Sequence, residues 1–329
     1  MPKIVGSAIG LLLAFFLLPA PASAWNAFGH RAVAKIAYME TSTNRPAAVK
    51  AIFELLKNHP HFGTEFDIFT KDRPDGVSEA EWAIVQAATW PDFVRPPKFP
   101  PLSDEQIKAH PRFKYHRKFD HFSDIALADP AFTAKIVPAN SGTLLDALAN
   151  AEKALNDPKT PLPDKAIAFC WLAHLCGDIH QPLHCTSFFS KDFPKGDGGG
   201  NLFLIGNTNL HTFWDDVLGS ASSSFHNLEA VSSDIHRAGQ LQRDKMIELK
   251  QNLTYESWAK ESHDVAVNVA YKDGDKMLQG ASQAHSHDDG PLSIPAFPAD
   301  YRAEAKVSAQ RRVALAGYRL ADKIDAIFK

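Results

Sequence analysis

The most informative stretch of this sequence is His174-Leu175-Cys176-Gly177-Asp178-Ile179-His180-Gln181-Pro182-Leu183-His184. His174 and Asp178 are four residues apart, so on a helix their side chains project from one face, one turn apart. A neutral imidazole and a carboxylate at that spacing can bind one zinc ion. Because Pro182 ends the helix, His184 approaches the same place from a turn. The stretch therefore predicts a helix that carries metal ligands.

Most of the remaining chain has apolar residues at helical spacing, which predicts a mainly α fold. The expected helices are 30–41, 46–58, 79–89, 143–156, 163–181, 251–271 and 301–328, and the expected loops are 95–101, 197–200 (flexible) and 273–297. Residues 201–207 read as a short strand and turn. Because no repeat or charge block marks a boundary, we expect one large helical domain, residues 25–329, with a short β-hairpin.

The composition is that of a globular protein. The chain has 329 residues, of which 45% are apolar and 22% are charged, so disorder is excluded as the dominant state. Thirty-five Lys and Arg residues stand against 38 Asp and Glu residues, for a formal charge of −3. The pI of about 6.6 excludes a basic coat that would hold duplex nucleic acid by charge alone.

Residues 1–24 have the pattern of a secretory signal peptide. Lys3 is followed by the apolar run 10–18, and Ala22-Ser23-Ala24 fits the small-residue cleavage pattern. The alternative is an uncleaved anchor, but the run is too short to span a bilayer comfortably. We therefore expect cleavage before Trp25, a secreted or periplasmic protein, and no stable membrane association.

A second pair repeats the spacing of the first, because His211 and Asp215 are also four residues apart. Cleavage before Trp25 would expose an α-amine whose pKa near 7.7–8.0 lets it bind zinc, with His30 five residues later. Asp92 and His121 are weaker signals, each more often structural than functional when taken alone. His116 lies close to His121 in the sequence, so either of these two histidines could be the metal ligand from this segment.

Together these motifs resemble the zinc nucleases of the S1/P1 type, whose superfamily also contains zinc-dependent phospholipase C. The resemblance runs from Trp25 to the last helix. It lies in the order and spacing of Trp25 with His30, Trp90-Pro91-Asp92-Phe93-Val94-Arg95, His121-Phe122-Ser123-Asp124, the His174–His184 stretch, Gly199-Gly200-Asn201, and His211 with Asp215. The fold of that family is mainly α, as the pattern of apolar residues also predicts.

The resemblance implies three zinc ions per chain. One ion would be held by Asp92, His121, His174 and Asp178, a second by His184, His211 and Asp215, and a third by the amine and carbonyl of Trp25 with His30 and the other oxygen of Asp178. Six positive charges against three aspartates leave the pocket at about +3, which attracts a polyanion to an acidic protein. Zinc lowers the pKa of bound water toward about 7 and so supplies a hydroxide nucleophile.

The resemblance also assigns the substrate contacts. Asp92 would orient the attacking water, and Arg95 would clamp a phosphate oxygen. Phe122 would stack on a base, which requires an unpaired base, and Asp124 would hydrogen-bond the edge of that base. For Phe122 and Asp124 the alternative is a structural role in the core or on the surface.

The implied function is hydrolysis of single-stranded DNA and RNA to 5′-phosphorylated products, with 3′-nucleotidase activity, by a monomer. One alternative is a zinc-dependent phospholipase C, but Ala27 and Phe28 occupy the stretch where those relatives carry a choline-binding carboxylate. The other alternative is a non-catalytic zinc-binding protein.

Overall fold

The structure is a computed structural model that describes residues 25–137, 141–272, 278, 280–282 and 294–329. The expected signal peptide and most of the expected loop 273–297 lie outside these residues.

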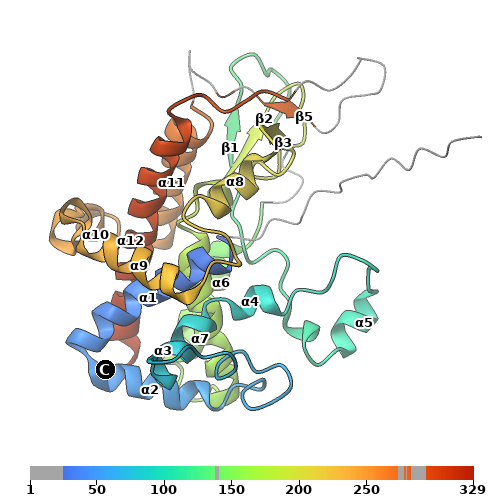
Figure 1. Ribbon diagram of the computed structural model, residues 1–329. Coiled ribbons are helices and arrows are strands. Elements are labelled where there is room, and N and C mark those ends of the chain that lie inside the picture. Colours follow the sequence, from blue (N-terminus) through green and yellow to red (C-terminus); the bar gives the residue numbers. More distant parts are fainter. Residues whose placement is uncertain (1–24, 138–140, 273–277, 279, 283–293) are drawn as a thin grey trace, which may run out of the picture.

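Three long helices form the centre of the molecule. They are α1 (Ala27–Asn44), α7 (Leu162–Asp178) and α12 (Tyr301–Ile327), and α1 packs along α12 while α7 contacts both (Figure 1). Every residue of α7 from Ala166 to Asp178 is buried. A helix that is buried on all sides has no amphipathic face, which explains its nearly uniform run of apolar residues.

The other helices surround this centre. They are α2 (Pro46–Leu56), α3 (Glu79–Ala87), α4 (Trp90–Phe93), α5 (Asp104–Ala109), α6 (Leu144–Asn156), α8 (Leu210–Asp216), α9 (Phe225–Arg237), α10 (Glu248–Gln251) and α11 (Tyr255–Val265). The short 3₁₀ helices are η1 (Phe113–Tyr115), η2 (Pro182–Cys185), η3 (Gly239–Leu241) and η4 (Arg243–Lys245), and η5 (Ala266–Ala270) is a π-helix that continues α11.

Most predicted helices are present, with boundaries shifted by a few residues. The exceptions have physical causes. The predicted helix 251–271 begins later, at Tyr255, and consists of α11 and η5, because Thr254 is the N-cap of α11 and forms a capping box. The pattern of apolar residues did not predict α9, a strongly amphipathic helix that Ser224 caps, or the short helices α4, α5 and α10.

The strands form two small sheets. The predicted hairpin is present as β3 (Phe203–Ile205) and β4 (Thr208–Asn209), and β5 (Ala281–Ser282) adds to it. A parallel pair, β1 (Ile125–Ala128) with β2 (Thr186–Phe189), was not predicted. Parallel strands need a long connection between them, so no local pattern reveals the pairing.

The mainly α fold class is confirmed. Among the described residues, one apolar core extends from Trp25, just before α1, to Ile324 on α12. The three cysteines are buried and free. No helix among the described residues has the length and apolar character needed to cross a bilayer.

Candidate metal centre

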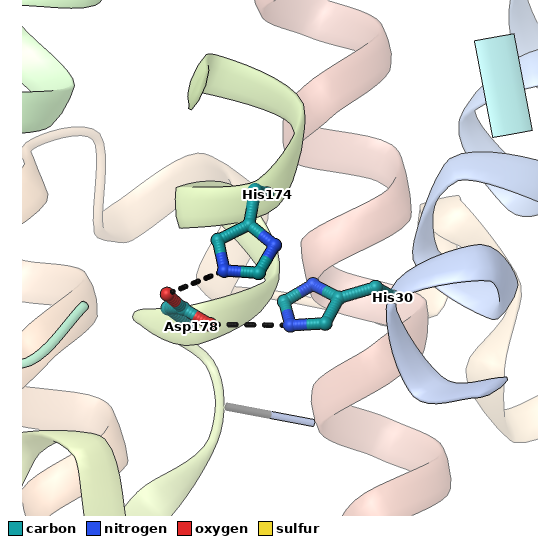
Figure 2. A group of neighbouring side chains, drawn as sticks. All are labelled: His30, His174 and Asp178. Carbon is teal, nitrogen blue, oxygen red and sulfur yellow. Dashed lines mark ion pairs between the residues drawn. The ribbon is translucent and has the colours of Figure 1, made fainter. Parts of the chain in front are cut away.

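The C-terminal end of α7 holds the first group of candidate ligands. His174 Nε2 lies 3.2 Å from Asp178 Oδ2, as their spacing on one helix face requires. His30 of α1 reaches the same carboxylate from the other side, with Nε2 at 3.3 Å from Oδ1. The His30 and His174 rings are stacked, with centroids 3.9 Å apart, and Asp178 lies at the edge of both rings with one oxygen toward each (Figure 2).

A second group shares His174 with the first. Asp92, on α4, places Oδ1 at 3.6 Å from His174 Nε2. His121 places Nδ1 at 2.9 Å from the same nitrogen and at 3.1 Å from Asp178 Oδ2. The structure places His121, and not His116, in this group. Three imidazoles, from α1, α7 and one loop, therefore converge on Asp178, and Asp92 joins the group through His174.

The third group comes from η2 and α8. His184 Nε2 and His211 Nε2 are 3.2 Å apart, and Asp215 Oδ2 lies 3.5 Å from His211 Nε2. Gln181 donates a 2.8 Å hydrogen bond to the other oxygen of Asp215 and fixes the orientation of that carboxylate. Gln181 lies inside the His174–His184 stretch, but no motif of the sequence pointed to a role for it.

Backbone carbonyls hold three of these histidines by their outer nitrogens. His174 Nδ1 lies 2.7 Å from the oxygen of Ala88, His184 Nδ1 lies 2.5 Å from that of His121, and His211 Nδ1 lies 2.6 Å from that of Gly199. Each contact directs Nε2 toward the other ligands. A metal-ligating histidine typically uses its second nitrogen in this way.

Two tertiary features create this arrangement. The pairing of β1 with β2 begins directly after Asp124 and Cys185, and Ser123 N donates to His184 O over 2.8 Å, which brings His121 beside His184. The loop 197–200, expected to be flexible, is packed against the centre. Gly199 has φ +63°, and a Cβ there would lie 2.3 Å from Leu183 O, so only glycine fits.

Electrostatics keep the imidazoles of His30 and His121 available as ligands, whereas at His174 burial is outweighed by Asp178 and Asp92, which raise its pKa. Burial, together with the neighbouring His174, lowers the pKa of His30 to about 4. Burial and Arg95 lower the pKa of His121 to about 3, so both rings are neutral near pH 7. Burial alone would raise the pKa of Asp178, but the surrounding imidazoles outweigh it and hold that pKa well below its usual range.

The donor set fits a divalent metal. In each of three groups the candidate donor atoms lie within 4.8 Å of one another: His30, His174 and Asp178; Asp92, His121 and His174; and His184, His211 and Asp215. Among the described residues, imidazoles alone lie within ion-pair distance of the fully buried Asp178. A buried carboxylate without a Lys or Arg partner is costly unless it coordinates a cation. Nitrogen and oxygen donors without cysteine are typical of catalytic zinc.

The other predicted site residues lie next to these groups. Arg95 Nη2 is 2.7 Å from Asp92 Oδ1. Phe122 is half-buried, and Asp124, which directly precedes β1, belongs to none of the three donor groups. Burial, and then the neighbouring Asp197, raise the pKa of Asp124 to about 7. Trp25 is fully buried and packs against Gly29, one residue before His30.

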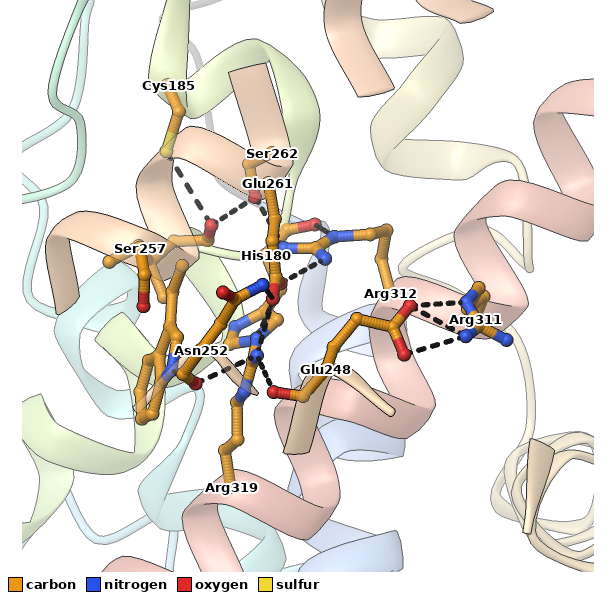
Figure 3. A network of polar contacts seen from close by, with 12 residues as sticks. His180, Cys185, Glu248, Asn252, Ser257, Glu261, Ser262, Arg311, Arg312 and Arg319 are labelled. Atoms are coloured by element: carbon orange, nitrogen blue, oxygen red, sulfur yellow. Dashed lines mark hydrogen bonds and ion pairs between the residues drawn. The ribbon is translucent and has the colours of Figure 1, made fainter. Parts of the chain in front are cut away.

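His180 supports the ligand loop from behind. Arg319 Nη1 lies 2.7 Å from His180 Nε2, and Arg312 Nε donates to His180 O over 3.2 Å (Figure 3). Glu261 accepts from both arginines, at 2.8 Å from Arg312 and 2.6 Å from Arg319. Ser262 Oγ donates to Ile179 O over 2.5 Å. This buried network fixes the segment between Asp178 and His184.

Comparison with known proteins identifies the family of this chain. The chain belongs to the S1/P1 nuclease family, whose model matches residues 25–329. The resemblance inferred from the motifs is therefore confirmed.

The relatives are distant. Endonuclease 5 of Arabidopsis thaliana is 30% identical over 118 residues, which is 32% of this chain and 38% of the relative. Endonuclease 4 of the same plant is 28% identical over 174 residues, 49% of this chain and 50% of the relative. Nuclease P1 of Penicillium citrinum is 23% identical over 203 residues, 57% of this chain and 67% of the relative. The alignments with the two plant endonucleases thus span half of those proteins or less.

Proposed function

We propose that this chain is an exported zinc-dependent phosphodiesterase that hydrolyses single-stranded DNA and RNA to 5′-phosphorylated products, with 3′-nucleotidase activity. One observation carries the proposal: the first two donor groups share His174, and histidines of both groups contact the carboxylate of Asp178. Arg95 lies beside them, in contact with Asp92. The names of the relatives support nuclease activity, since they are endonucleases and nucleases. Removal of residues 1–24 and action as a monomer belong to the same proposal.

Three zinc ions would be distributed over the donor groups. We assign the first to Asp92, His121, His174 and Asp178, the second to His184, His211 and Asp215, and the third to the amine and carbonyl of Trp25, His30 and the second oxygen of Asp178. The two oxygens of Asp178 already point to different imidazoles, which suits a bridging carboxylate. When bound, zinc supplies Lewis acidity toward phosphate oxygens and makes water nucleophilic near neutral pH.

The side chains around the metals would position the substrate and the water. Burial opposes ionisation of Asp92, but Arg95 and the imidazoles outweigh it and lower its pKa, so Asp92 can accept a hydrogen bond from the attacking water. The guanidinium of Arg95 offers further donors to a phosphate oxygen. Phe122 would stack on an unpaired base, and Asp124 would bind the edge of that base.

One assay set tests this proposal. The purified chain that begins at Trp25 is incubated with single-stranded DNA, RNA, 3′-AMP and phosphatidylcholine, with and without a chelator. We expect single-stranded DNA, RNA and 3′-AMP to be hydrolysed. The chelator should abolish all three reactions. Turnover of the lipid without turnover of nucleic acid would overturn the proposal in favour of a phospholipase. Tight zinc binding without any turnover would establish a non-catalytic protein.

The α-amine of Trp25 has its own test. A form that retains one alanine before Trp25 should contain less zinc and lose most activity, because an amide nitrogen is a poor ligand. Full activity and full zinc content in that form would remove the terminal amine from the ligand set.

A further inference from the structure

One segment of this acidic protein is strongly basic. Residues 95–119, here called the basic arm, contain seven Lys and Arg residues against Asp104 and Glu105, a net charge of +5. The whole chain carries −3, so the rest of the chain carries −8. The arm runs between two candidate ligands, Asp92 and His121, and is therefore attached to the metal centre at both ends.

The arm contributes little to the core, against which its Tyr115 packs. Neither α5 nor η1 has a buried residue, and Figure 1 shows α5 set away from the helical body on the side of α4. Ordering backbone without burying apolar surface costs conformational entropy and returns little stability. A structured segment of this kind is better explained by a contact with another molecule than by folding.

The arm is nevertheless held in a defined place. Arg112 stacks on Phe93 at 3.8 Å and donates from Nε to the Phe93 carbonyl over 2.6 Å. Tyr115 packs on Trp90 with ring centroids 5.5 Å apart. Arg117 lies 5.0 Å from the ring of Trp171, which itself contacts His121. These contacts tie the arm to α4 and to the metal centre.

The remaining charges face solvent. Lys108, Lys114 and Lys118 are exposed, and none of them forms an ion pair with any residue that the structure describes. At the end of the arm, Phe119 is 44% exposed and its ring lies 6.5 Å from that of Phe122. Surfaces that bind single-stranded nucleic acid combine exposed cations, which contact the phosphates, with aromatic rings, on which the bases stack. The arm has both features.

We propose that the basic arm binds the phosphates of a single-stranded polynucleotide beyond the nucleotide held at the metal centre, with Phe119 as an additional stacking platform. This inference rests on the proposed function, which concerns the cleaved bond, and adds a separate surface for the rest of the strand. The surface accounts for how a chain of net charge −3 retains a long polyanion. Its contribution is electrostatic, independent of sequence and screened by salt.

The test compares two triple variants with the same change in net charge. Lys108→Gln, Lys114→Gln and Lys118→Gln remove the solvent-facing charges of the arm. Lys50→Gln, Lys159→Gln and Lys250→Gln remove three exposed lysines from other parts of the surface. For each protein, kcat and KM are measured between 50 and 200 mM salt on a long single-stranded oligonucleotide and on a dinucleoside monophosphate.

We expect the arm variant to show a KM for the oligonucleotide raised about tenfold or more, and a logarithmic salt dependence that is weaker by about two. Its kinetics on the dinucleoside monophosphate should be unchanged, and the control variant should behave as the wild type. An equal effect of the control variant, or an equal loss on the small substrate, would overturn the proposal. If the triple variant unfolds at a lower temperature, Lys114→Glu alone serves the same comparison.

A failure of the proposed function is distinguishable from a failure of the arm. If neither substrate is cleaved, the proposed function has failed, and fluorescence anisotropy with a labelled oligonucleotide still tests the arm. Equal affinity of the wild type and the arm variant for that strand would then refute the inference. Binding to anionic phospholipid vesicles, but not to the strand, would refute it as well.

Discussion

Asn26 Nδ2 donates a 2.5 Å hydrogen bond to Asp216 Oδ1, and this bond joins the start of α1 to the end of α8. Asn26 is also the N-cap of α1, since its Oδ1 accepts from the backbone of Phe28 and Gly29. Asp216 follows the candidate ligand Asp215. The sequence left Asp216 without a role, whereas the structure shows that it anchors the helix that carries His30.

The first prediction concerns this bond. Asp216→Ala should reduce zinc content and activity, because the first turn of α1 loses its attachment to α8. Asp216→Asn keeps an acceptor oxygen for Asn26 and should retain both properties. The zinc content per chain is measured by atomic emission. Activity is measured as kcat/KM on single-stranded DNA. Equal losses in the two variants would show that the charge of Asp216, and not the bond, is what matters.

The second prediction concerns the packing of α7 against His30 at Gly177. A Cβ at Gly177 would lie 2.7 Å from His30 Nδ1 and 3.1 Å from Cε1. Gly177→Ala should therefore displace His30, lower the zinc content and reduce kcat at least about tenfold, since small misplacements of a catalytic site are costly. Gly239→Ala is the matched control, because a Cβ there meets no atom within 4 Å. Wild-type zinc content and kcat in Gly177→Ala would contradict the packing argument.

The third prediction concerns His180. His180→Ala leaves the buried Arg319 without one of its hydrogen-bond partners, which should cost about 1–3 kcal/mol of the free energy of unfolding. Urea denaturation of the metal-free protein measures this cost without interference from zinc. His226→Ala, at an exposed histidine of α9, should change stability by less than about 0.5 kcal/mol. Similar values for the two variants would show that the network does not depend on His180.

The fourth prediction concerns pH. Burial and Asp197 raise the pKa of Asp124 to about 7 in the folded protein, above its value near 3.9 in an unfolded chain. The folded state then binds more protons between these values, so the contribution of Asp124 to stability falls as the pH rises from about 4 to 7.

Asp124→Asn should remove the loss of stability that accompanies ionisation of Asp124. The Tm of the variant should exceed that of the wild type by a few degrees at pH 8 but not at pH 4. Thermal unfolding of the metal-free protein at the two pH values checks it. Asp75→Asn, at an exposed aspartate, is the control and should show no such difference. A variant that is less stable than the wild type at pH 8 would mean that the ionised Asp124 is stabilised by its surroundings.

The sequence predicted the local features well. Helical periodicity indicated α1, α7 and α12, and the four-residue spacings placed His174 with Asp178 and His211 with Asp215. These features depend on residues within one or two turns of each other, so the order of residues is sufficient to specify them.

Only the tertiary structure decided how these local pieces meet. The parallel pairing of β1 with β2 brings His121 to His184, and the crossing of α1 over α7 brings His30 to Asp178. It also decided that Asn26 meets Asp216 and that the basic arm projects from the centre. These contacts join residues between about 60 and 190 positions apart in the sequence. Such contacts arise from the packing of complete elements around a shared core, which no local pattern of residues encodes.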